Sequence, residues 1–157
     1  MTEVVIGADI EMPWCIPPSG TSYESQMAKV GDVVTFTWSF DFHDINIYQN
    51  EECDMDGSTF LAAKTGSTYT FTSDDVGEVI FACSVGTHCN QGQTVKFTVV
   101  AEDSMEEVEY SPVENNPCYT PPSDPDTSAS IAMSFSVGST ILMALGLGLS
   151  LFTTFSS

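Results

Sequence analysis

The sequence predicts an all-β domain over residues 1–101, and three observations carry that prediction. Short segments rich in β-branched and aromatic residues alternate apolar with polar positions, the pattern of half-buried strands. Turn-forming residues separate these segments at short intervals. No convincing amphipathic helix is visible in the same region. Several short strands at this spacing indicate a sandwich or a barrel.

The clearest predicted strand is VVTFTWSFDF, residues 33–42. Its apolar positions alternate with polar ones, and they are Val34, Phe36, Trp38, Phe40 and Phe42. The apolar parity then changes, because Ile45 and Ile47 fall on odd numbers. A strand cannot change parity without a bulge or a bend, so we expect one near Asp41–Phe42. Such a bend would turn His43 onto the face that the two isoleucines bury.

The last predicted strand begins with a polar residue on its inward face. Gln93 shares that face with Val95, Phe97 and Val99. A glutamine there is unusual unless its amide has a partner, because burying an unpaired amide is costly. Further strands are predicted in STYTFT and VGEVIFAC, with turns at Gly31-Asp32, Thr65-Gly66 and Asp75-Val76-Gly77.

The composition changes after residue 101. Residues 102–130 are acidic, rich in Pro and Ser and without any basic residue, which predicts a disordered, extended linker. Residues 131–157 are uncharged and strongly apolar from Ile141 to Phe152. The small residues at 127–130, followed by this tail, favour a GPI-attachment signal over a single-pass membrane anchor, since no Lys or Arg flanks the tail.

A GPI signal requires entry into the secretory pathway. Residues 1–14 lack the basic start and apolar run of a leader peptide. We therefore expect that the leader is missing from this sequence and that the protein lies on the extracellular face of the plasma membrane. A cytosolic tail-anchored protein is the alternative, although the cysteines of this chain suit disulfides, which are rare in the cytosol.

The charge balance limits the partners of the chain. Three basic residues stand against 22 acidic ones, for a formal net charge of −19. Nucleic acid is excluded as a partner, because phosphate binding requires clustered Lys and Arg. A surface of this sign favours basic partners and salt-sensitive association.

The chain has an odd number of cysteines, namely Cys15, Cys53, Cys83, Cys89 and Cys118. An odd count in a secreted chain leaves either a free thiol or one cysteine with another task. Two disulfides and one metal-binding thiolate would satisfy this count, and an oxidising compartment is the expected setting.

The stretch FACSVGTHCNQGQ, residues 81–93, contains most of the residues that could bind a metal or react. Together with His43 it gives the pattern His…Cys83-x₄-His88-x₄-Gln93. A thiolate and two imidazoles with a weak axial oxygen suit a copper ion that alternates between Cu(II) and Cu(I). One loop between two strands can deliver three of these groups, and His43 at the predicted bend can supply the fourth.

Three other interpretations remain open at this point. Cys83 and Cys89 could form a plain disulfide turn with His88 on the surface, although strand parity points Cys83 inward. A zinc site could use Cys53, Cys83, His88 and Cys89, but the tight paired spacing of structural zinc motifs is absent. A catalytic Cys83–His88 dyad lacks an identifiable third group to orient the base.

The sequence also resembles a known family. The runs GDVVTFTWSFDFHDI and FACSVGTHCNQGQTVKFTV, with Cys53 between them and W-x-I-P-P near the start, are similar to phytocyanins, the plant-type members of the cupredoxin family. The resemblance covers about residues 3–100. Gln93 stands where most relatives carry Met, which makes the chain similar to the stellacyanin branch.

The resemblance implies a Greek-key β-sandwich that holds one type 1 copper ion. It implies equatorial binding by His43, Cys83 and His88, an axial Gln93 oxygen, and a Cys53–Cys89 disulfide. Cys15 and Cys118 depart from the family pattern, and their pairing is a hypothesis by elimination. The implied function is that of an electron carrier rather than an enzyme, with the ring edge of His88 as the electron port and an unknown, basic redox partner. A copper-free surface module of the early nodulin-like type and a copper-storage protein are the alternatives.

Overall fold

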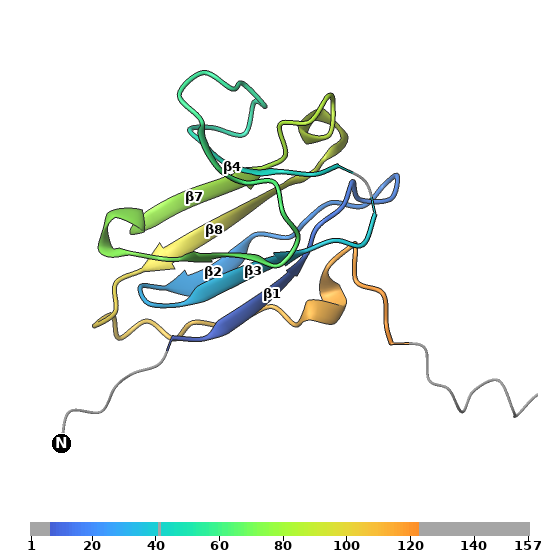
Figure 1. Ribbon diagram of the computed structural model, residues 1–157. Coiled ribbons are helices and arrows are strands. Elements are labelled where there is room, and N and C mark those ends of the chain that lie inside the picture. Colours follow the sequence, from blue (N-terminus) through green and yellow to red (C-terminus); the bar gives the residue numbers. More distant parts are fainter. Residues whose placement is uncertain (1–6, 41, 123–157) are drawn as a thin grey trace, which may run out of the picture. The chain divides into compact units, whose positions relative to one another are not determined.

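The computed structural model describes residues 7–40 and 42–122, and in them the chain folds into two β-sheets (Figure 1). The first has three strands in the order β1-β3-β6: β1 (Asp9–Pro13), β3 (Val33–Thr37) and β6 (Ser67–Thr70). The second has five in the order β2-β8-β7-β4-β5: β2 (Gln26–Lys29), β8 (Thr94–Val100), β7 (Gly77–Ala82), β4 (Ile45–Tyr48) and β5 (Thr59–Ala62). The helices of the described residues are three 3₁₀ turns: η1 (Ser73–Asp75), η2 (Cys89–Gln91) and η3 (Val113–Asn115). The predicted all-β sandwich is confirmed.

The pairing of the strands brings distant parts of the chain together. β1 pairs with β3, and β2 with β8, in parallel. The central strand β7 pairs with β4 on one side and β8 on the other, both antiparallel. The chain segments that follow β7 and precede β4 and β8 therefore lie at the same end of the five-stranded sheet.

The main core is aromatic and lies between the sheets. The ring centroids of Phe36 in β3 and Phe81 in β7 are 5.1 Å apart, and those of Phe81 and Phe97 in β8 are 5.7 Å apart. The predicted inward face of the last strand is confirmed, because Gln93 and its three apolar partners are all buried. The opposite face of the five-stranded sheet carries a second, smaller buried cluster of Tyr48, Ile80, Ala82 and Cys89.

The predicted strand over residues 33–42 is correct only in its first half. β3 ends at Thr37, and the side chains of Phe40 and Phe42 are 83% and 89% exposed rather than buried. The ladder with β6 ends where Phe36 pairs with Ser67, and two residues later the Trp38 amide donates to the Thr65 hydroxyl instead. Without a partner strand the alternation has no sheet to follow.

The position of the expected bulge also differs. The chain bends at residues 39–40, and a register shift lies between Ile45 and Asn46 in the pairing of β4 with β5. Asp41, part of the predicted bend, lies outside the described residues. His43 is nevertheless buried, as the change of parity predicted.

Residues 102–121 pack onto the domain, contrary to the predicted linker. The compact unit runs to Pro121. The Tyr110 hydroxyl donates to the buried Asp32 carboxylate at 2.8 Å, and η3 contacts β1, beside which it is drawn in Figure 1. Cys118 is bonded to Cys15. A polar sequence is thus ordered by a covalent link and a buried acceptor, which composition does not reveal.

The expectations for the rest of the chain stay untested. Residues 123–130 of the predicted linker and the apolar tail 131–157 lie outside the described residues. Within residues 7–40 and 42–122, none of the helices is long and apolar enough to cross a membrane.

Candidate metal centre

Three of the predicted ligands converge at the end of the five-stranded sheet where Cys83 follows β7. One donor atom from each of His43, Cys83 and His88 lies within 4.8 Å of the others. The two imidazole Nδ1 atoms are 3.2 Å apart. The Cys83 Sγ lies 3.4 Å from Nδ1 of His88 and 4.0 Å from Nδ1 of His43.

This triangle has the size that a single ion requires. Metal–nitrogen distances of about 2.05 Å and a metal–sulfur distance of about 2.3 Å in a trigonal plane give edges of about 3.5 Å between nitrogens and about 3.8 Å from nitrogen to sulfur. The three measured edges depart from these values by less than about 0.5 Å. The donor set of one thiolate and two imidazoles suits copper.

The loop 83–93 supplies two of the three converging residues and is closed on itself. The Cys83 amide donates to the Gln93 carbonyl at 3.1 Å, and the Gln93 amide donates to the His88 carbonyl at 3.0 Å. η2 then ends at Gly92, whose φ of 93° lies in the left-handed region that glycine adopts without strain. This turn leads the chain into β8 with Gln93 directed inward.

A disulfide fixes the outer side of this loop. Cys89, next to His88, is bonded to Cys53, 36 residues earlier. Cys53 packs against the small cluster on the outer face of the sheet. In the chain-entropy model a closed loop of this length stabilises the fold by about 4 kcal/mol.

His43 comes from the segment between β3 and β4 and is held by contacts from elsewhere. Its side chain is only 5% exposed. The Trp38 indole meets its ring edge-on at a centroid distance of 6.0 Å, and the His88 ring lies at 5.0 Å. These contacts fix the plane of the imidazole while its Nδ1 faces the thiol.

A buried carboxylate that the sequence analysis missed joins the two sides of the site. Asp44 accepts a hydrogen bond from the Ser84 amide at 2.6 Å and another from the Ser84 hydroxyl. Its own carbonyl accepts from the Trp14 indole at 3.1 Å. Each bridging residue directly follows a predicted ligand, His43 or Cys83. The only signal in the sequence was an acidic residue placed between buried positions.

Burial controls the charge of the Cys83 thiol. The loss of solvent raises the pKa of this group to about 11, and hydrogen bonds from the Asp44 and Val85 backbones offset part of the rise. The thiol therefore keeps its proton at neutral pH when no metal is present. Binding of a metal must release that proton.

Gln93 has the environment expected of a fourth donor. Its side chain is fully buried directly before β8, beside Cys83 across the closed end of the loop. Neither its Oε1 nor its Nε2 has a hydrogen-bond partner among the described residues. A buried amide without partners is costly, so an oxygen in this state fits a metal donor.

The cysteine pairing bears on the other interpretations. Cys53 is bonded to Cys89 and Cys15 to Cys118, which leaves the buried Cys83 as the free cysteine of the described residues. A Cys83–Cys89 disulfide turn is therefore wrong for this structure. The zinc set is wrong as well, because two of its four ligands, the thiolates of Cys53 and Cys89, are joined in a disulfide.

The chain was compared with known proteins in sequence and in structure. No family model matches the chain. Cucumber peeling cupredoxin from Cucumis sativus is 27% identical over 99 residues, which cover 58% of this chain and 72% of that protein. Among solved structures, cucumber stellacyanin with Cu²⁺ aligns with a TM-score of 0.48 and 21% identity, covering 60% of this chain and 97% of that one. Spinach plantacyanin aligns with a TM-score of 0.40 and 18% identity, covering 59% and 100%.

Proposed function

Since the sequence similarity and the His–Cys–His cluster support a phytocyanin-type cupredoxin with a single type 1 copper, we propose that the protein carries single electrons at this site. His43, Cys83 and His88 would hold the copper ion, and Gln93 would supply a fourth, weaker oxygen donor. The convergence of one sulfur and two Nδ1 atoms beside a buried, unpartnered amide is the observation that supports this most strongly.

The chain's own residues keep the donors in one arrangement. Bound copper supplies the one-electron chemistry. The Cys83–Gln93 hydrogen bond closes the loop, the Asp44–Ser84 bridge links the loop to β4, and the disulfide at Cys89 restrains His88. A site that moves little between two oxidation states exchanges electrons rapidly, because little reorganisation accompanies the transfer.

The fourth donor, Gln93, would set the direction in which the reduction potential of the bound copper is tuned. An amide oxygen is a harder donor than a thioether sulfur, and it favours Cu(II) over Cu(I). We therefore propose a lower potential than that of the same protein with methionine at position 93.

The exchange of electrons proceeds through the ring edge of His88. Its side chain is half-buried, whereas those of His43 and Cys83 are buried. The protein transforms no substrate of its own in this proposal. Its net charge of −19 favours a basic redox partner and an association rate that falls as salt is added.

We propose that the tail 131–157 is a GPI-attachment signal that is removed and replaced by a GPI anchor, which holds the protein at the extracellular face of the plasma membrane. Two disulfides in the domain fit an oxidising compartment. Release of the protein from membranes by a phosphatidylinositol-specific phospholipase would support the anchor. Release by detergent alone would favour a single membrane-spanning segment.

The visible spectrum of the copper-loaded protein tests the proposed function. We expect a strong Cu(II)–thiolate band that bleaches on reduction. Cys83→Ser should abolish the band, while Gln93→Met should keep it and raise the reduction potential. A colourless protein, or one that takes up zinc alone, would contradict electron transfer and favour a copper-free surface module.

A further inference from the structure

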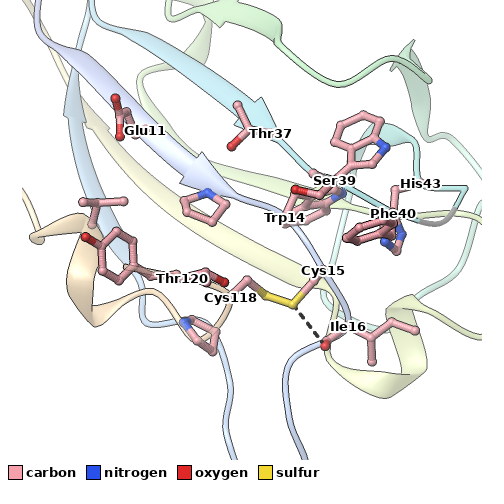
Figure 2. Close-up of a pocket in the computed structure, with 15 residues that line it drawn as sticks. Glu11, Trp14, Cys15, Ile16, Thr37, Ser39, Phe40, His43, Cys118 and Thr120 are labelled. Atoms are coloured by element: carbon pink, nitrogen blue, oxygen red, sulfur yellow. Dashed lines mark hydrogen bonds between the residues drawn. A yellow bond between two sulfur atoms is a disulfide. The ribbon is translucent and has the colours of Figure 1, made fainter. Parts of the chain in front are cut away.

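A cavity of about 790 Å³ lies beside the candidate metal centre and reaches His43 (Figure 2). Its walls come from β1 and the residues after it, from the end of β3, and from residues 113–120, with the Cys15–Cys118 disulfide along one side. Small-molecule sites in proteins have volumes of this order, and aromatic groups with a few polar ones line them.

Aromatic side chains line the cavity, and Trp38 and Phe40 lie at its His43 end. Both tryptophans of the chain, Trp14 and Trp38, line the cavity, together with Phe40. Figure 2 shows Phe40 close to His43 at one end, with Glu11 at the other. The Phe40 side chain is 83% exposed, so it has apolar surface left to cover a planar ring.

The polar part of the lining can bind hydroxyl groups. The hydroxyls of Thr37, Ser39 and Thr120 line the cavity and make no hydrogen bond to other described residues. Thr37 and Ser39 lie between Glu11 and His43 in Figure 2. The Glu11 carboxylate is exposed and forms no ion pair in the described part of the chain, so it can accept from a ligand hydroxyl or attract a cation.

The charge of the site limits the ligand further. No Lys or Arg lines the cavity, and Glu11 and the net charge of −19 both repel anions. We propose that this cavity binds a small phenolic compound, neutral or positively charged, with its ring against Trp38 and Phe40 and its polar groups toward Thr37 and Glu11. This site is separate from the metal-binding residues apart from its contact with His43, and it does not depend on a bound metal.

Three phenols that share a ring and a hydroxyl separate the effect of charge from that of shape. Tyramine is cationic, p-cresol is neutral and 4-hydroxybenzoate is anionic. We expect saturable shifts of the two indole N–H signals in NMR titrations of the metal-free full chain with both disulfides intact. Both signals report on the cavity, since the chain has no other tryptophan. At low salt, tyramine should bind at least about tenfold more tightly than 4-hydroxybenzoate, with p-cresol between them.

Matched variants assign the binding to this cavity. Phe40→Ala should raise the Kd of p-cresol about three- to tenfold. Phe60→Ala removes another exposed phenylalanine, on β5 and outside the lining, and should leave that Kd unchanged. Glu11→Gln should reduce the advantage of tyramine over p-cresol, whereas Glu24→Gln, also outside the lining, should not.

Several results would overturn the proposal. They are indole shifts that do not saturate, 4-hydroxybenzoate binding as tightly as tyramine, or equal losses in Phe40→Ala and Phe60→Ala. None of them depends on copper, so a colourless protein in the spectroscopic test would leave the phenol site standing.

Discussion

The two segments that supply the candidate metal centre are held in different ways. The loop 83–93 carries Cys83, His88 and Gln93, and it is closed by its own hydrogen bonds and tied outward by a disulfide. The segment 38–44 contributes only His43, follows a strand that ends early, and leaves Phe40 and Phe42 exposed. Hydrogen bonds within the loop 83–93 fix one side of the site. Contacts with residues distant in the sequence fix the other side, which holds His43.

The difference indicates which side tolerates change. His43 depends on the Trp38 ring and on the Asp44–Ser84 bridge, and each can be altered by a substitution outside the loop, at Trp38 or Asp44. Cys83 and Gln93 are neighbours across the end of the β7–β8 pairing and move with the sheet. The His43 side is therefore expected to be the more compliant one.

Loss of the disulfide at the loop should have a large effect both on stability and on the candidate metal centre. In Cys53→Ala/Cys89→Ala, we expect the free energy of unfolding to fall by about 4 kcal/mol, because the 36-residue link no longer restrains the unfolded chain. Urea denaturation measures this loss. Cys15→Ala/Cys118→Ala is the control and should lose a comparable amount while leaving the NMR signals of His88 in place. An unchanged His88 environment in the first variant would contradict the proposed restraint.

Breaking the bridge between the two sides should rank second. Asp44→Ala leaves the Ser84 amide and hydroxyl unpaired, at a cost of about 2–4 kcal/mol. Asp44→Asn keeps a carbonyl acceptor and should lose less than half of that. NMR of the alanine variant should show larger shifts at His43 than at Gln93. Equal shifts on both sides would argue against a more compliant His43 side.

The pH dependence of copper binding tests the buried thiol. Because burial raises the pKa of Cys83 to about 11, the thiol is protonated below that pH, and binding releases its proton. The Kd should therefore fall about tenfold for each pH unit gained between about pH 7.5 and 9.5, or about 1.4 kcal/mol per unit. Competition with a chelator of known affinity gives the Kd. A flat profile would mean that the thiol is already ionised without metal.

The smallest effect on stability is expected at residue 42, beyond the point where the predicted strand ends in the structure. Phe42→Ser should change the free energy of unfolding by less than about 0.5 kcal/mol, because the side chain is exposed. Phe36→Ala, at a position that the sequence pattern treats as equivalent, should cost about 3–5 kcal/mol. Thermal or urea unfolding measures both losses of stability. If the two variants lost similar amounts, the result would favour a strand that runs to residue 42.

The features of the fold and of the candidate site that depend on a local pattern of residues could be predicted from the sequence. The alternation in residues 93–99 placed Gln93 and its neighbours correctly, and one short loop held the chemistry together. The end of β3 was not predictable, because it depends on where β6 begins and on the Thr65 hydroxyl. The Asp44–Ser84 bridge joins residues 40 positions apart, so no window of sequence contains it.

The packing of residues 102–121 was hidden for a related reason. Composition describes a segment in isolation, whereas the anchors of this one are Asp32 and Cys15, far back in the chain. The pairing of Cys15 with Cys118 was reached by elimination alone. Nothing in the spacing of the cysteines indicated that a stretch so polar would lie against β1.

That pairing also determines how the domain responds to mechanical tension. Cys15 and Cys118 are 103 positions apart and covalently joined. A force that pulls on the two ends of the chain passes from residue 15 through the S–S bond to residue 118, so it cannot extend the backbone of residues 16–117. The parts of the domain that can be drawn away are the residues before Cys15, chiefly β1 from its neighbour β3, and the few residues after Cys118. All four proposed copper ligands lie inside the shielded loop, so stretching should leave their arrangement intact until the disulfide is reduced.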